Sequence, residues 1–152
     1  MDKKILAQKI KDQAMSLGFY GVSITKAEFL EPEARKLEEW LNKGHHGEMS
    51  YMENHFDLRT DPTKLVPNAK SVICLMYNYY SDQKQTDEDA PKISMYAYGK
   101  DYHTVVKEKL WTLFQFIKNE AGDIDGRCFV DSAPVMEREL ATRAGLGWTG
   151  KN

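Results

Sequence analysis

A single carboxylate stands where an apolar stretch runs into a predicted helix. The mostly apolar residues 127 to 130 predict a short strand, and Asp131 follows them directly. Ser132 is a candidate N-cap and Pro134 suits a first helical turn, so we expect a helix that ends near residue 143. Ligands of open α/β sheets bind at the carboxyl ends of strands, beside such helix N-termini. Asp131 therefore either caps the helix or acts as a general acid, and spacing alone favours the cap.

A second junction of the same kind carries tyrosines and a histidine. The sequence YGKDYH, residues 98 to 103, lies between an apolar stretch at 93 to 98 and a strongly amphipathic helical pattern that starts just after His103. In one interpretation Asp101 caps that helix while the tyrosines pack as amphipathic rings. In the other, Tyr102 and His103 offer hydrogen-bond donors to a ligand. We expect this junction to line the same rim of the sheet as Asp131.

Three further patterns give weaker signals. His45 and His46 lack the same-face spacing of an HExxH zinc site, so a loop pair is favoured over a metal site, and no residue is predicted to ligate a metal. Arg59 either anchors its loop through an ion pair or binds a ligand amide, carboxylate or phosphate. The glycines of residues 145 to 151 match no phosphate loop, and they favour close approach of the backbone to a large flat cofactor.

Amphipathic and apolar patterns predict the elements that position these residues. Helices are expected at 6 to 17 and 32 to 43, each closed by a glycine, and again after residue 103. Strands are expected at 19 to 24, 71 to 80 and 93 to 98, the second of them central and covered on both faces. The order of elements predicts an α/β or α+β domain with one central mixed sheet covered by helices.

Composition excludes several classes of protein. The chain has 152 residues, 41% of them hydrophobic and 29% charged, which suits one globular domain. No apolar run approaches the roughly 20 residues that cross a bilayer and no signal-peptide block is seen, so we expect a cytoplasmic protein without a membrane partner. The formal charge of −2 gives no global reason to expect nucleic-acid binding. Cys74 and Cys128 fall in predicted buried strands and are expected to be reduced core residues.

Several segments together resemble one enzyme family. The strings VDSAPVMERELATRAGLGWTGKN and YGKDYH, with HGEMSYM and FDLRTDPTKLVPNAKSV, resemble the N-terminal domain of epoxyqueuosine reductases over nearly the whole chain. Members of that family are cobalamin-dependent iron–sulfur oxidoreductases that reduce epoxyqueuosine to queuosine at the wobble position of tRNA. The resemblance implies that residues 1 to 152 form a cobalamin-binding domain. It also implies a layered fold similar to nitroreductase-like corrinoid-binding domains.

The resemblance also implies roles for particular residues. Asp131 matches the family's proton donor, so the acid role is now favoured over the cap. A corrin-binding cleft is expected at the strand ends, and its implied partners are tRNA bearing epoxyqueuosine and an electron donor. Glu137, Arg138 and Glu139 are interpreted as a solvated helix face. The residues expected to contact the cofactor are Arg59, Ser94, Tyr102, His103, Asp131, Lys151 and Asn152.

The cysteine content departs from the family. Epoxyqueuosine reductases hold two [4Fe–4S] clusters on closely spaced cysteines, and the two cysteines of this chain cannot ligate one. We therefore expect a domain without the C-terminal ferredoxin-like part, inactive alone. One alternative is a non-catalytic corrinoid-binding or tRNA-docking module. Another is a corrinoid enzyme with a different substrate, such as a reductive dehalogenase, although the match at residues 131 to 152 argues against it.

Overall fold

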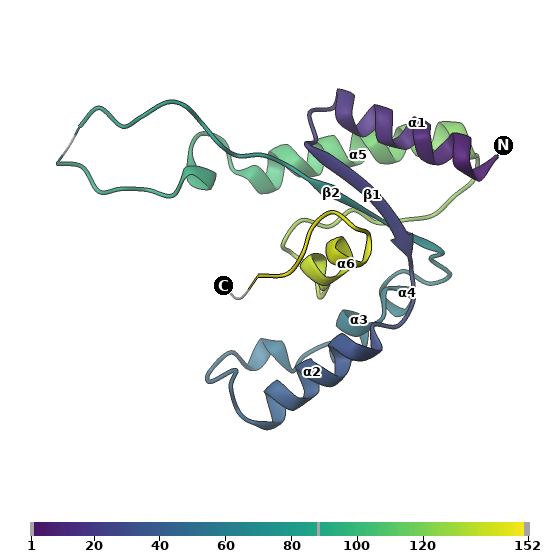
Figure 1. The fold of residues 1–152 in the computed structure, drawn as a ribbon, viewed down its shortest axis with the longest axis horizontal. Helices are drawn as coiled ribbons and strands as arrows, with labels where there is room; N and C mark the ends of the chain where they lie inside the picture. Colours follow the sequence, from purple (N-terminus) through teal and green to yellow (C-terminus); the bar gives the residue numbers. More distant parts are fainter. Residues whose placement is uncertain (1, 88, 151–152) are drawn as a thin grey trace.

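The computed structural model describes residues 2 to 87 and 89 to 150, and it places helices around a small sheet (Figure 1). The elements in chain order are α1 (Lys3–Ser16), β1 (Gly21–Lys26), α2 (Glu31–Asn42), the 3-10 helix η1 (Ser50–Met52), α3 (Phe56–Thr60), α4 (Pro62–Leu65), β2 (Ser71–Met76), the 3-10 helix η2 (Met95–Ala97), α5 (Tyr102–Ala121) and α6 (Glu137–Arg143). The predicted class, a sheet with helices packed against it, is confirmed.

The sheet of the described residues has two antiparallel strands. β1 pairs with β2 in a register that runs from Gly21 opposite Met76 to Lys26 opposite Ser71. The helices α1 and α5 lie together on one side of the sheet, and α6 lies on the other (Figure 1). Along each strand, side chains point alternately toward α1 and α5 and toward α6, because successive residues of a strand face opposite sides of the sheet.

The main core lies between the two long helices and the sheet. Its buried members come from α1, from Phe19 just before β1, and from α5, and Val22, Ile73 and Leu75 of the strands pack against them. The buried residues are Ile10, Ala14, Phe19, Leu113 and Ile117. The opposite sheet face, which carries the paired residues Ser23 and Cys74, is turned toward α6: Ser23 Oγ donates a hydrogen bond to the carbonyl of Ala144.

Two predicted strands are wrong. Residues 93 to 98 are exposed and contain the 3-10 helix η2 (Met95–Ala97), and residues 127 to 130 run as irregular chain. Both stretches are apolar enough for a strand, but neither has a pairing partner among the described residues, and apolar content alone does not make a ladder. The predicted mixed sheet is therefore a purely antiparallel pair, and β2 ends at Met76 instead of residue 80.

The last helix begins later than predicted. α6 starts at Glu137, with Met136 as the N-cap residue, and the proposed cap Ser132 lies in the irregular segment before it. Val135 N–H donates to the carbonyl of Ala133 at 2.7 Å, a tight turn that keeps the chain out of helical conformation there. The predicted end is confirmed, since Gly145 follows the helix with φ 79°.

The backbone at Gly145 supports a matched pair of substitutions. Gly145 has positive φ, and a Cβ added to it would meet no heavy atom within 4 Å; Gly147 is equally open without positive φ. Gly145→Ala is expected to lower the free energy of unfolding by about 1–2 kcal/mol, because left-handed backbone disfavours a Cβ. Gly147→Ala should change it by less than about 0.5 kcal/mol. Denaturant titration checks both, and equal effects would contradict this explanation.

No helix within the described ranges is long and apolar enough to cross a membrane.

Candidate functional site

The N-terminus of α5 carries the first part of the site. Asp101 is the N-cap residue: its Oδ1 accepts the backbone N–H of His103 at 2.9 Å and lies 2.8 Å from Nδ1 of the same histidine. The hydrogen bond from the His103 side chain lowers the pKa of Asp101. Asp101 therefore caps the helix, as one of the two interpretations of this junction holds. The His103 ring in turn stacks on Tyr102, with ring centroids 4.1 Å apart.

Asp131 reaches this helix start from a distant part of the chain. The hydroxyl of Tyr102 donates to Asp131 Oδ2 at 2.5 Å. The backbone of Asp131 has φ 48°, in the left-handed region, and its N–H donates to Glu137 Oε1 at 3.1 Å. The structure thus brings together Tyr102, His103 and Asp131, which the sequence places on two separate junctions. Asp131 does not cap α6 in the predicted way, because α6 begins six residues later.

The Tyr102 phenol is the titratable reporter of this contact. Its hydrogen bond to Asp131 raises the pKa of Tyr102 to about 12, above the ordinary ~10. We expect Asp131→Ala to return this pKa toward ~10. The stabilisation from the contact is fully present below the ordinary value and is lost as pH rises through about 12. An NMR pH titration of the tyrosine ring carbons measures the change. A Tyr102 pKa that does not fall in the variant would contradict the contact.

A chain of aromatic rings extends the site toward the segment that contains Ser94. Ser94 is the N-cap residue of η2, and in that helix the ring of Tyr96 meets Tyr102 edge-on with centroids 5.9 Å apart. Tyr79 contacts Tyr96 in the same manner at 6.4 Å. Ser94 therefore lies two residues from Tyr96, whose ring contacts Tyr102 of the site. The only sequence signal for Tyr96 is its place inside the 94 to 103 segment, and no role is predicted for it there.

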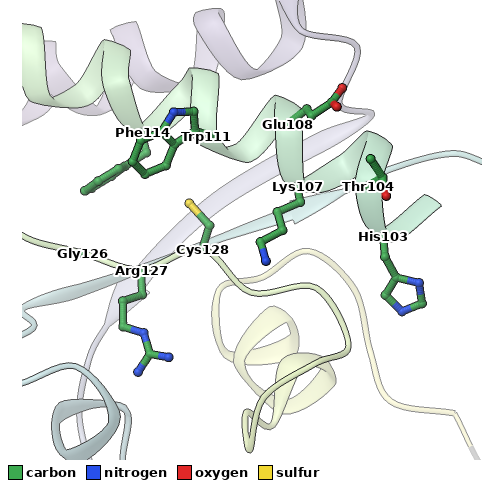
Figure 2. A pocket seen from close by; sticks show the side chains of 9 residues that line it. All are labelled: His103, Thr104, Lys107, Glu108, Trp111, Phe114, Gly126, Arg127 and Cys128. Atoms are coloured by element: carbon green, nitrogen blue, oxygen red, sulfur yellow. The ribbon is translucent and has the colours of Figure 1, made fainter. Parts of the chain in front are cut away.

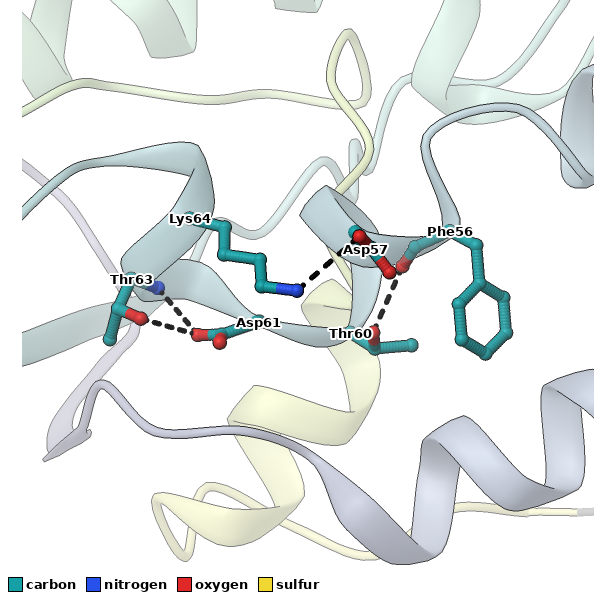
Figure 3. Close-up of polar contacts among 6 residues, drawn as sticks. All are labelled: Phe56, Asp57, Thr60, Asp61, Thr63 and Lys64. Atoms are coloured by element: carbon teal, nitrogen blue, oxygen red, sulfur yellow. Dashed lines mark hydrogen bonds and ion pairs between the residues drawn. The ribbon is translucent and has the colours of Figure 1, made fainter.

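Arg59 lies on a separate, firmly held part of the chain. Thr60 Oγ1 donates to the carbonyl of Phe56 at 2.9 Å, and the Oδ1 atom of Asp61 accepts from both the N–H and the hydroxyl of Thr63 (Figure 3). Within this frame the Nε atom of Arg59 is buried and has no hydrogen-bond partner among the described residues. No described hydrogen bond or ring contact joins Arg59 to the Tyr102–Asp131 pair. Lys151 and Asn152, also expected in the site, lie outside the described residues.

An open groove of about 730 Å³ adjoins the site (Figure 2). It runs between α5 and residues 126 to 128, and His103 forms part of its lining. Lys107 and Arg127 supply cationic groups, and Trp111 supplies an aromatic surface that is 57% exposed. The groove therefore combines two cations and one acid, Glu108, with apolar and aromatic area, next to the Tyr102–Asp131 contact.

Metal-ligating side chains are scattered in the part of the chain that the structure describes. No group of three His, Cys, Asp or Glu residues there is arranged to hold a metal ion. His46 Nε2 pairs with Glu53 Oε1 at 2.8 Å, in the turn region after α2. Cys74 and Cys128 are free and half-buried, but Cys128 does not lie in a strand as predicted.

Glu137 has a role that its sequence pattern does not predict. Glu137 is exposed, as expected for a solvated face, but its carboxylate also accepts the backbone N–H of Asp131. Desolvation raises the pKa of Glu137, the hydrogen bond from the Asp131 amide partly offsets this increase, and the charge of Asp131 adds to it. The only sequence signal is an acid at the first position of the helix that follows Asp131.

Comparison with known proteins identifies relatives of the whole chain. A family model described as "Epoxyqueuosine reductase QueG, DUF1730" matches residues 59–132. The curated epoxyqueuosine reductase of Cyclobacterium marinum is 57% identical over 146 residues, which is 95% of this chain and 47% of the relative. That of Escherichia coli is 42% identical over 157 aligned positions, covering 100% of this chain and 41% of the relative. The chain spans less than half the length of these relatives.

Solved structures agree with the sequence relatives. An epoxyqueuosine reductase crystallised with an epoxyqueuosine-modified tRNA-Tyr stem loop superposes with a TM-score of 0.82 at 28% identity, over 97% of this chain and 40% of that one. The enzyme of Bacillus subtilis, solved with an aspartate-bearing catalytic loop swung out of the active site, gives 0.80 at 26% identity with the same coverage. The resemblance seen in the sequence is confirmed: the chain is similar to part of the epoxyqueuosine reductases of several bacteria.

Proposed function

We propose that this chain forms the part of an epoxyqueuosine reductase that binds cobalamin and donates a proton through Asp131. The observation that carries the proposal is the hydrogen bond between Tyr102 and Asp131, because it fixes an exposed carboxyl group at the N-terminus of α5. A Bacillus subtilis relative has a catalytic loop named for an aspartate, which agrees with an acid on a loop. The assignment of Asp131 as the proton donor rests on this hydrogen bond and on the catalytic loop of the relative.

The reaction sets what the acid must do. Converting an epoxide to an alkene breaks both carbon–oxygen bonds, consumes two electrons and two protons, and releases the oxygen as water. A positioned acid lowers the barrier by protonating the departing oxygen. Tyr102 occupies Oδ2 of Asp131, and Oδ1 has no hydrogen-bond partner among the described residues. We therefore assign Oδ1 as the oxygen that carries the proton to the substrate.

The chemistry of the side chains fits a corrin. The ring carries amide side chains around a flat apolar face, so it needs hydrogen-bonding groups and aromatic surface. The unpaired Nε of Arg59 would donate to a side-chain amide, and Tyr96, Tyr102 and His103 would supply rings and polar edges. Ser94, Lys151 and Asn152 remain further proposed contacts. Bound cobalamin would deliver the electrons at its cobalt.

Iron–sulfur clusters do not fit the residues described here. A [4Fe–4S] cluster needs four cysteine thiolates, and the chain has only Cys74 and Cys128. Burial raises the pKa of both thiols, which disfavours the thiolate form that binds iron. The electron donor is proposed to be a separate low-potential group.

The proposed substrate is the anticodon stem loop of a tRNA bearing epoxyqueuosine. A relative was solved with such a stem loop, and here the groove beside His103 carries Lys107 and Arg127. Because the chain has a net charge of −2, phosphate binding would depend on such local cations. Binding of the stem loop is therefore expected to weaken as salt concentration rises.

A titration of the purified chain with cobalamin tests the cofactor assignment. We expect saturable binding and a change of the visible spectrum to that of the corrin without its lower base. Arg59→Gln should weaken binding, while Arg35→Gln, an exposed arginine on α2, serves as the matched control. An unchanged spectrum at saturating protein would contradict the assignment. Cobalamin binding by the chain, without epoxide reduction by any longer protein that contains it, would favour the non-catalytic docking module instead.

A further inference from the structure

The loop that carries Asp131 is weakly held along its own length. Residues 131 to 136 are irregular, and the backbone bond described within them is the turn from Val135 N–H to the Ala133 carbonyl. Asp131 itself has φ 48°, a conformation that a residue with a Cβ rarely adopts without support. The position of the acid must therefore be fixed by contacts outside the loop.

The helix after the loop is, by contrast, firmly anchored. Leu140 is only 2% exposed, and the carbonyl of Ala144 accepts the Ser23 hydroxyl from β1. At the end of α6, Arg143 lies 3.3 Å from Glu28 and 3.3 Å from Glu33, on the segment that leads into α2 and on α2 itself. α6 is thus tied to the sheet and to a second helix (Figure 1).

Glu137 connects the anchored helix to the weakly held loop. It is the first residue of α6, and its Oε1 accepts the backbone N–H of Asp131 at 3.1 Å. Its carboxylate also lies close enough to β2 that, after burial, its charge contributes to raising the pKa of Cys74 to about 11. Asp131 from the loop and Cys74 from the sheet are titratable groups that interact electrostatically with Glu137.

We propose that Glu137 is a positioning residue, a latch that binds the Asp131 amide and holds the acid against Tyr102. This inference rests on the proposed role of Asp131. While the hydrogen bond between Glu137 and the Asp131 amide is formed, α6 holds the loop in place. When this bond is broken, the carboxyl group of Asp131 is free to leave Tyr102. The Bacillus subtilis relative, whose catalytic loop was solved swung out of the active site, shows that such a loop has a second position in that protein.

The test follows the Asp131 amide by NMR in the chain itself. An amide proton that donates to a carboxylate changes its chemical shift as that carboxylate is protonated. Since burial and the Asp131 charge raise the pKa of Glu137, part of the Asp131 amide shift should titrate above the ordinary glutamate value of ~4.3. Hydrogen exchange of the same amide reports how often the loop opens.

Three variants separate the latch from a merely structural role. Glu137→Gln retains an acceptor oxygen, so it should abolish that titration step and keep slow exchange. Glu137→Ala should abolish the step and speed exchange of the Asp131 amide about 10-fold, the effect of losing a charge-assisted hydrogen bond. Glu139→Ala, on the same helix, should change neither quantity. An unchanged step and unchanged exchange in Glu137→Ala would overturn the proposal.

The outcome does not depend on turnover. If Glu137→Ala does not fold, the folded Glu137→Gln variant decides the matter: persistence of the titration step overturns the latch. A confirmed latch in a protein whose activity survives loss of the Asp131 carboxyl would contradict the proposed acid and leave the latch standing. If Asp131 is essential for activity but the Glu137 contact is absent, the proposed acid stands and the latch is contradicted.

Discussion

Asp131→Asn is expected to lower the rate of epoxide reduction about 10²- to 10⁴-fold, the usual contribution of a positioned general acid. The assay uses a chimera in which this chain replaces the matching 47% of the Cyclobacterium marinum enzyme, called here the chimeric reductase. Asparagine has the shape of aspartate and its amide oxygen still accepts the Tyr102 hydroxyl, but it has no carboxyl proton to give. Cobalamin and stem-loop affinities should stay unchanged, so the loss should appear in kcat and not in KM.

A second aspartate provides the control for this substitution. Asp125 is exposed and accepts the backbone N–H of Gly126 at 2.8 Å, in the segment before the site. Asp125→Asn should leave turnover within a factor of about two, since it removes a carboxylate of the same kind outside the site. If Asp131→Asn turns over substrate as fast as Asp125→Asn does, the acid is another group.

The second large effect is on stability. Leu140 on α6 is 2% exposed, and its loss is expected to lower the free energy of unfolding by about 2–5 kcal/mol, as for other buried leucines replaced by alanine. The cavity in Leu140→Ala would lie under the helix that holds Glu137. We therefore also expect faster hydrogen exchange at the Asp131 amide. Denaturant unfolding measures the first effect, and NMR measures the second.

An exposed residue of α1 gives the comparison for Leu140. Met15 is 52% exposed, so Met15→Ala should change the free energy of unfolding by less than about 0.5 kcal/mol. Equal destabilisation by the two substitutions would mean that α6 is not packed as described.

Local signals explain which elements could be predicted from the sequence. The helices α1, α2 and α5 each combine an apolar stripe with a capping residue or a glycine stop, and these signals act within a few residues. Strands need a partner distant in the chain. The apolar stretch at 71 to 76 pairs with β1, whereas those at 93 to 98 and 127 to 130 have no described partner, and the sequence does not distinguish the three.

Three of the residues that the sequence singles out lie together in the structure, but the contacts among them were not predictable. The sequence places Tyr102, His103 and Asp131 at two junctions, and the structure joins them through one hydrogen bond and one stacked pair. The role of Glu137 depends on the left-handed backbone of Asp131, which turns its N–H toward α6. Aspartate tolerates that conformation but does not require it, so no sequence pattern specifies it.

The most direct test of the account is the product of one reaction. The chimeric reductase would be incubated with cobalamin, a low-potential reductant and an epoxyqueuosine-modified tRNA stem loop, and the nucleosides would then be analysed by mass spectrometry. We expect loss of the mass of one oxygen atom from the modified nucleoside, with a rate that depends on Asp131. An intact epoxide, in a chimera that binds both cobalamin and the stem loop, would contradict it.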